Sequence, residues 1–573
     1  MKLVANSQRI LSELFNQDFK DTESYSDEAQ FFEFFAAKHI LKSEDLSDEE
    51  IENGILGGGN DGGCDAIYTL YNDIYVTEDI VKEMSAGKEG CIKLEIVQAK
   101  RQTSFGEDAI MKWKTTIDNL LAIGVDDTQY TTRYNEDVRT AFSLFRELYV
   151  KLLRNTPKLI ITFHYATFAS EIHPNVEAQA EELKQLVHKL FPSKKTTVDV
   201  RLWGAEDLLV AAQSQPEHKL NLPLAETPIN IGTHHDYIAL VNLAKYYYFI
   251  TDDSGNLRKH IFESNVRDYQ GHNTVNQDIQ ASLSQPTGED FWWLNNGITL
   301  LTDEAVLATS KELILTEPAV VNGLQTSNEI YNFYRANPDM LKSEQRNILL
   351  RIIVPESEDS RDRIILATNN QTNIPKSSLR ANDPIHWQIE LYLKGRGLYY
   401  DRRKNYYKNQ GKKSDEIVSV SFLAQCMISL LLQKPNFARA RPSTLLTKDE
   451  TYTELYIKNQ DLDVFYNAAR LGKTVELYVR KSSTYTQAQK NDILFYVLYF
   501  CVAQTVNSSI ITAVNIKEIN LQDFSESFIQ SAADHVFKTY MRLGGDGKTA
   551  KGSTLIEALM KDLNSEKSHN ISQ

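Results

Sequence analysis

A glycine-rich acidic bend, Gly57-Gly58-Gly59-Asn60-Asp61-Gly62-Gly63-Cys64-Asp65-Ala66-Ile67-Tyr68, is followed by an apolar strand, Leu94-Glu95-Ile96-Val97-Gln98-Ala99-Lys100. Side chains alternate between the two faces of a strand, so Gln98 and Lys100 project to one side and the intervening apolar residues to the other. The carboxylate of Asp65 is an oxygen ligand that suits a hard cation such as Mg2+. Lys100 is placed to orient an attacking water or to stabilise negative charge on a phosphate. These stretches predict a metal-dependent phosphodiesterase site on an α/β sheet.

The order of Asp and then Gln-x-Lys resembles the PD-(D/E)xK nuclease superfamily, in the Mrr-like variant where Gln replaces the acidic residue before x-Lys. The resemblance covers residues 25–115 and implies a restriction-endonuclease-like central sheet flanked by helices. It also implies a Glu on an N-terminal helix. Glu33 fits because it shares an apolar helical face, where a charge is costly without a partner; Glu28 is its competitor. The implied catalytic residues are Asp65, Gln98, Lys100 and Glu33, with Mg2+ or Mn2+ held by Asp65 and Glu33.

Plain structural roles compete with this prediction. Asp in a glycine-rich turn commonly satisfies backbone amides, which is an alternative role for Asp65. Lys100 and Arg101 would also suit a solvated strand end. Asp61 is expected to shape the bend. Glu95 points to the strand face opposite Lys100, so we do not expect it to bind the metal.

Composition sets broad limits on the protein class. A chain of 573 residues is too long for one core and predicts about three domains. The four cysteines have no metal-ligand spacing, so we expect reduced, buried thiols. No signal peptide is visible, and the longest apolar run, 493–503, is too short for a membrane helix. We therefore expect a soluble cytoplasmic protein. Its net charge of −15 argues against indiscriminate binding of polyanions.

One local stretch, 392–413, is nevertheless strongly basic and rich in tyrosine. Cations for phosphates together with rings for bases are typical of nucleic-acid binding, above all of single strands. The alternative is a solvated loop anchored by its tyrosines. The residues predicted to bind nucleic acid are Arg402, Arg403, Lys404, Tyr399 and Tyr400.

Alternating helix and strand signals divide the chain into an α/β N-terminal part and a second half with its own motifs. The predicted domains are a nuclease domain at 1–212, a proline-containing linker at 213–228, an α+β domain at 229–480 and a helical region at 481–573.

The second half contains three motifs rich in side-chain amides. They are Trp292-Trp293-Leu294-Asn295-Asn296-Gly297, Val320-Val321-Asn322-Gly323-Leu324-Gln325 and Ala367-Thr368-Asn369-Asn370-Gln371. With Asn265-Val266-Arg267-Asp268-Tyr269 before them, these strings resemble the AIPR family, named for abortive-infection phage resistance. The resemblance covers 230–480 and implies a bacterial anti-phage protein, often with a nuclease-like front end.

The amide motifs have two interpretations. Asn-Gly pairs favour tight turns, and Asn296-Gly297 predicts a two-residue hairpin. Alternatively, the amides converge on a pocket that reads base edges or a nucleotide, with Arg267 pairing with a phosphate or carboxylate. The predicted pocket residues are Asn296, Asn322, Gln325, Asn370, Gln371 and Arg267.

The main hypothesis from the sequence is a cytoplasmic abortive-infection protein that hydrolyses phosphodiester bonds, with DNA as the expected nucleic acid. Its AIPR domain would control the nuclease in response to a phage-derived trigger or a nucleotide ligand, and a homo-oligomer is compatible with this. The alternative is a non-catalytic nucleic-acid or nucleotide sensor built on a decayed nuclease fold, because Gln98 is a weaker metal ligand than Glu. A third possibility is a protein-interaction toxin that acts through the second half alone.

Overall fold

A mixed five-stranded sheet forms the centre of the N-terminal part. The computed structural model describes residues 6–83, 90–213, 219–231, 235–252, 255–262, 274–284, 289–369, 383–402, 404–440, 442–457 and 460–570. The sheet has the order β2-β1-β3-β4-β5. Its strands are β1 (Ala66–Tyr71), β2 (Ile74–Tyr75), β3 (Cys91–Lys100), β4 (Lys158–Thr167) and β5 (Thr196–Trp203). β1 is antiparallel to β2 and β3, whereas β3, β4 and β5 run parallel.

Helices cover both faces of this sheet. Leu94 and Ile96 of β3 belong to the core with α5 (Glu107–Leu120), α6 (Glu136–Leu152) and α7 (Pro174–Leu190). Val97 and Ala99 face the other way, into the core with α1 (Asn6–Asp21), α2 (Glu28–Ile40) and α8 (Ala205–Gln213). Two shorter helices, α3 (Asp48–Gly54) and α4 (Glu78–Glu83), complete this N-terminal lobe, residues 6–213. The predicted α/β fold, a central sheet flanked by helices, is confirmed.

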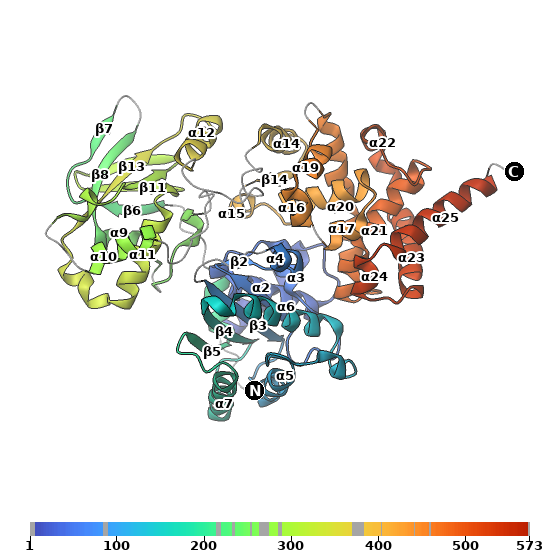
Figure 1. Ribbon diagram of the computed structural model, residues 1–573, viewed down its shortest axis with the longest axis horizontal. Coiled ribbons are helices and arrows are strands. Elements are labelled where there is room, and N and C mark those ends of the chain that lie inside the picture. Colours follow the sequence, from blue (N-terminus) through green and yellow to red (C-terminus); the bar gives the residue numbers. More distant parts are fainter. Residues whose placement is uncertain are drawn as a thin grey trace.

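The middle lobe, residues 219–369, contains two further sheets (Figure 1). One has the order β10-β11-β6, from β6 (Lys219–Pro223), β10 (Glu304–Thr309) and β11 (Glu312–Thr316). The other has the order β12-β9-β13-β8-β7, from β7 (Ile229–Ile231), β8 (Asp236–Asn242), β9 (Ile298–Leu301), β12 (Ala319–Asn322) and β13 (Asn347–Ile353). Its helices are α9 (Leu243–Phe249), α10 (Thr274–Ser284), α11 (Leu324–Ala336) and α12 (Glu358–Asn369).

Strand β6 corrects the predicted linker at 213–228. Leu220 and Leu222 alternate with exposed residues and are buried in the middle lobe, so this segment is a strand paired with β11. Pro223 is tolerated because β6 is an edge strand, where a missing N–H costs little. Pro223 is therefore the last residue of a strand.

The C-terminal lobe, residues 383–570, is almost entirely helical. A single core runs through it from Ile389 to Leu563. Its helices are α14 (Pro384–Lys394), α15 (Tyr406–Asn409), α16 (Val420–Leu431), α17 (Pro435–Ala440), α18 (Pro442–Thr447), α19 (Asp449–Leu455), α20 (Leu462–Lys481), α21 (Gln487–Thr505), α22 (Ala513–Glu518), α23 (Glu526–Arg542), α24 (Gly547–Lys551) and α25 (Thr554–Asn570). A small parallel pair, β14 (Tyr399–Asp401) and β15 (Ile417–Ser419), sits near its start.

This lobe has two consequences for the sequence predictions. The predicted boundary at 480/481 falls between α20 and α21, which pack against each other inside one core, so the helical part begins at α14 instead. The apolar run at 493–503 is the buried centre of α21. Among the described residues, no helix combines the length and apolar character that crossing a bilayer requires.

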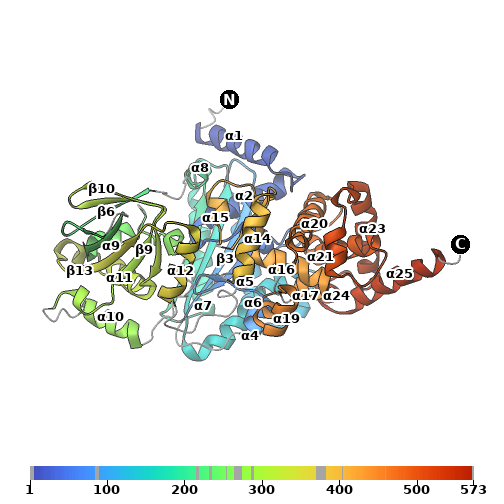
Figure 2. The same ribbon diagram turned by 90° about the horizontal axis from the view of Figure 1, so that it is seen from above.

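The C-terminal lobe lies against the N-terminal lobe, whereas the middle lobe stands to the other side (Figures 1 and 2). Acidic α3 supplies much of this contact. Its Glu50 pairs with Lys404 at 2.8 Å, and its Asp48 pairs with Lys408 at 2.6 Å. At the other end of the contact, Lys551 pairs with Glu78 of α4 at 2.6 Å. These ion pairs join the two lobes.

Candidate functional site

Asp65 is held rigidly at the entry to β1. Its backbone N–H donates to the carbonyl of Val97 at 2.9 Å, and its Oδ2 accepts from the N–H of Ala99 at 2.7 Å. The bend before it needs glycine, because Gly63 has a φ of 85°. Asp61 Oδ1 accepts from the Gly63 N–H at 2.6 Å, which is the bend-shaping role predicted for Asp61. Asp65 is only 8 % exposed.

Gln98 lies next to this carboxylate on β3, between the two residues that bond to Asp65. It is 3 % exposed, and its Oε1 is buried without a hydrogen-bond partner among the described residues. A Cβ built on Gly63 would lie 3.2 Å from this oxygen, so the bend closes over it. Leaving a buried acceptor unpaired costs about 1–3 kcal/mol. An acceptor in this position is able to bind a cation or a water.

Glu33 approaches the same corner from α2, on the helical face predicted from the sequence. Burial, followed by the charges of Asp65, Asp61 and Asp27, raises the pKa of Glu33 to about 9. Burial also raises the pKa of Asp65 to about 7, against an opposing hydrogen bond from Ala99. When the pKa values of two neighbouring carboxyl groups are both raised, the nearby cations do not offset the burial of the charges and their repulsion. Glu28, the competitor for this role, instead forms an ion pair with Arg101.

Lys100 completes the set at the end of β3. Its Nζ donates to Asp108 Oδ2 of α5 at 2.8 Å, and its charge lowers the pKa of Asp65. Lys112, on the exposed side of α5, lowers the pKa of Asp65 as well. Sequence reasoning missed Lys112, because nothing in an amphipathic helix shows which of its exposed lysines faces the sheet edge.

The residues present fit a hard divalent cation. Within the described ranges, no three His, Cys, Asp or Glu side chains are grouped to hold a metal. The available donors are the carboxylates of Asp65 and Glu33 and the amide oxygen of Gln98. Mg2+ is usually bound by one or two carboxylates and keeps several waters, so this all-oxygen set matches it. The orphaned Oε1 of Gln98 is the structural observation behind this fit.

The basic stretch serves mainly to pack the C-terminal lobe. Tyr400 is fully buried and bonds His386 at 2.7 Å, and Arg402 is 8 % exposed and donates to Glu390 at 2.6 Å. These two side chains cannot touch nucleic acid without unpacking the lobe. Lys404 is bound to Glu50 of α3, and the Tyr399 ring lies under Lys412, with 4.5 Å between Nζ and the ring centroid. Arg403 lies outside the described residues.

The described residues of the amide motifs in the middle lobe form turns or hydrogen-bond to backbone groups. Phe291–Trp293 is a short 3-10 helix and β9 pairs with β12 and β13, so the predicted two-residue hairpin at Asn296-Gly297 does not form. Position 297 still requires glycine, because its φ is 77° and because a Cβ there would lie 2.7 Å from the Leu349 carbonyl oxygen. Asn322 donates to the carbonyl of Thr368 at 3.1 Å.

Of the remaining residues predicted to form the pocket, the structure describes two. Asn296 accepts from Arg351 through its carbonyl, and Gln325 lies in the first turn of α11. Arg267, Asn370 and Gln371 lie outside the described residues.

Comparison with known proteins gives one match. Residues 262–542 match the family model described as AIPR protein. This stretch is therefore similar to the AIPR family. The matched region takes in most of the middle lobe and most of the C-terminal lobe. No curated protein and no solved structure matches the chain.

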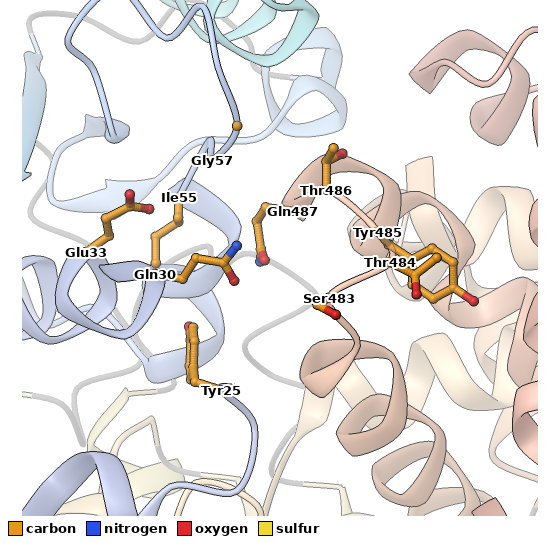
Figure 3. Close-up of a pocket in the computed structure, with 11 residues that line it drawn as sticks. Tyr25, Gln30, Glu33, Ile55, Gly57, Ser483, Thr484, Tyr485, Thr486 and Gln487 are labelled. Atoms are coloured by element: carbon orange, nitrogen blue, oxygen red, sulfur yellow. The ribbon is translucent and has the colours of Figure 1, made fainter. Parts of the chain in front are cut away.

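The stretch matched by the AIPR model, residues 262–542, reaches the N-terminal lobe at Glu33. A cavity of about 200 Å³ lies between α2 and the glycine bend on one side and the α20–α21 loop on the other. Figure 3 shows Gln30 and Glu33 on the α2 side, opposite Gln487 and the loop residues before it. Ser26 Oγ donates to the Lys481 carbonyl at 3.0 Å and joins the two walls. Glu33 therefore belongs both to the pair of carboxylates and to the lining of this cavity.

Proposed function

We propose that this protein is a metal-dependent endonuclease of anti-phage defence, with its phosphodiesterase site in the N-terminal lobe. The observation that carries the proposal is the buried, unpaired Oε1 of Gln98 beside the carboxylate of Asp65. Glu33 adds a second carboxylate whose pKa is raised by burial and by Asp65. A packed lobe has no structural use for such an arrangement, which costs stability. A cation-binding site, in contrast, requires unpaired oxygen atoms of this kind.

The residues have distinct roles in this reaction. Asp65 and Glu33 would hold Mg2+ or Mn2+, with the amide oxygen of Gln98 as a neutral third donor. A bound divalent cation supplies a Lewis acid for the phosphate and a more acidic water. Lys100 stabilises the negative charge that grows on the phosphate or orients the attacking water. Its partner Asp108 is exposed, so the ammonium can leave that ion pair at low cost when substrate arrives.

The AIPR match supports the biological setting, abortive infection, in which phage replication is stopped at the expense of the infected cell. Cleavage without control would be lethal to the host, so the AIPR region is proposed to regulate the nuclease. DNA is the proposed substrate, and a phage-derived molecule or a nucleotide is the proposed trigger. The cytoplasm, where phage nucleic acid arrives, is the proposed location.

The test is cleavage of supercoiled plasmid and of single-stranded RNA with Mg2+, with Mn2+ and with chelator. Wild type is compared with Lys100→Ala and with Lys158→Ala, a control at the exposed start of the neighbouring strand β4. We expect metal-dependent cutting that falls about a hundredfold or more in Lys100→Ala and is unchanged in the control. Cutting that survives chelator or the loss of Lys100 would overturn the proposal. Binding without cutting, retained in Asp65→Ala, would favour the sensor.

A further inference from the structure

The cavity beside Glu33 is lined by neutral polar groups from two lobes. Gln30 and Glu33 come from α2, and Ser483, Thr486 and Gln487 come from the α20–α21 loop and the start of α21. Among its described lining residues, Glu33 is the only acid and there is no Lys or Arg. A site for an isolated phosphate would be expected to carry cations. Amides and hydroxyls, which both donate and accept, suit the polar edge of a base or a sugar.

One of these groups has an unused hydrogen bond. The Nε2 of Gln487 is buried and has no acceptor among the described residues. The glycine bend presses against this side chain, because a Cβ on Gly57 would lie 2.9 Å from Gln487 Cβ. The backbone of Gly57 has a φ of 54°, so the bend here accommodates a close approach that other residues would hinder. The bend that leads to Asp65 therefore shapes one wall of the cavity as well.

The cavity is small. Its volume of about 200 Å³ is the space of roughly seven waters at ~30 Å³ each. A duplex cannot enter such a space, because its bases are stacked and paired inside two backbones. One base or sugar of an unpaired strand can, and its polar edge is then free to accept a hydrogen bond from Gln487.

We propose that this cavity binds one unpaired nucleotide next to the scissile phosphate, so that the AIPR region supplies half of the substrate site and the substrate is a single-stranded polynucleotide. This inference rests on the proposed function, since it places the scissile phosphate at Asp65 and Lys100. It assigns Gln487 and Gln30 to substrate binding. It also explains why a loop of the C-terminal lobe is held beside the carboxylates by Ser26 and Lys481.

Binding is measured by fluorescence anisotropy in the full-length Lys100→Ala protein, in which cleavage is removed. The probes are a fluorescein-labelled single-stranded DNA, the RNA of the same sequence, and the DNA annealed to its complement. Gln487→Leu and Gln30→Leu change one wall each. Gln504→Leu, near the other end of α21, is the matched control. Circular dichroism and thermal unfolding verify that each variant is folded.

We expect single strands to bind at least about tenfold more tightly than duplex, and Gln487→Leu to weaken single-strand binding about tenfold. Gln504→Leu should leave it unchanged, and the DNA and RNA probes identify which sugar the site prefers. If Gln487→Leu fails to fold, the effect of Gln30→Leu, on the other wall, on single-strand binding decides whether the cavity binds the nucleotide. Equal or tighter binding of duplex, no effect of either wall variant, or tighter binding in Gln487→Leu would overturn the inference.

The two proposals fail in different ways. Single-strand binding that depends on Gln487, in a wild type that never cuts with Mg2+ or Mn2+, would support the cavity and overturn the nuclease. Metal-dependent cutting that ignores Gln487 and Gln30 would support the nuclease and overturn the cavity.

Discussion

Glu33 and Asp65 reach the same corner of the N-terminal lobe from two different elements, α2 and the start of β1. After burial, the charge of Asp65 is the largest influence that raises the pKa of Glu33. Two carboxylates in this relationship destabilise each other until a cation or a proton joins them. A divalent ion bound by both carboxylates, as proposed above, would take the place of the proton that otherwise joins them.

Metal binding should appear as thermal stabilisation. A ligand that binds only the folded state adds about 2–3 kcal/mol of stability at a hundred times its Kd. We expect Mg2+ or Mn2+ to raise the Tm of wild type and chelator to reverse this. The effect should vanish in Glu33→Gln and in Asp65→Asn. Asp118→Asn, an exposed acid on α5, is the control and should respond like wild type. Equal stabilisation of all four proteins would mean that the ion binds elsewhere.

Gln98→Glu should have opposite effects with and without metal. A third carboxylate beside Asp65 and Glu33 increases the repulsion in the metal-free protein, so its Tm in chelator should fall. A carboxylate is a stronger ligand than an amide for a hard cation, so the Kd for Mn2+ should fall about tenfold. Calorimetric titration with Mn2+ gives the Kd, and a thermal scan in chelator gives the stability. A variant with weaker metal binding would remove Gln98 from the ligand set.

Asp108→Asn tests whether Lys100 must leave its ion pair. Asp108 is exposed and holds the Lys100 ammonium at 2.8 Å, so the pair is worth at most about 1 kcal/mol. Releasing Lys100 toward the phosphate should raise the cleavage rate by up to about fivefold. Single-turnover cleavage is the measurement, with Asp118→Asn as the matched control. A slower Asp108→Asn enzyme would show that Asp108 positions Lys100 for the reaction.

The local parts of this site follow from short-range rules. Period-two alternation predicts that Gln98 lies on the strand face opposite Val97 and Ala99. In the structure Val97 and Ala99 pack into the core with α2, and the Gln98 side chain lies against the glycine bend. The helical projection of Glu33 likewise gives the correct face. These inferences hold because each depends on the regular geometry of one element and on where its apolar residues go.

What the sequence did not reveal is long-range pairing. The acidic run of α3 and the basic stretch after α14 each look like solvated or ligand-binding surface when seen alone, yet Glu50 and Asp48 bind Lys404 and Lys408 across the lobe interface. The approach of Gln487 to the glycine bend is hidden for the same reason. No local pattern specifies which distant charge or amide will meet it.

Glu49 of α3 should make stability depend on pH. Burial raises its pKa to about 7, against a hydrogen bond from Ser419; Glu476 and Glu50 also raise it, and Lys473 lowers it. The unfolded chain ionises first, because its pKa is near 4.5. Glu49 therefore costs no stability below that pH, and the cost grows as the pH rises to about 7 and then stays constant.

Glu49→Gln should accordingly be more stable than wild type at pH 8, by about 1–3 kcal/mol, and equal to it at pH 4.5. Urea unfolding at both pH values gives the difference. Glu23→Gln is the matched control, because Glu23 is an exposed acid in the connection between α1 and α2, outside α3. A difference that grows toward low pH would contradict the assigned sign.

Arg480 and Glu52 form a buried ion pair between the N-terminal and C-terminal lobes, 3.2 Å apart with side chains 8 % and 15 % exposed. Removing one member leaves the other buried charge without its nearest partner, at a cost of up to about 3–5 kcal/mol; the loss should be smaller for Glu52→Gln, because Arg480 keeps Glu476 at 4.0 Å. Arg480→Met and Glu52→Gln should each lower the Tm and open the α20–α21 loop to protease. The double variant, which buries neither charge, should recover much of the loss. Additive losses in the double-mutant cycle would show that the two side chains do not act as a pair across this interface.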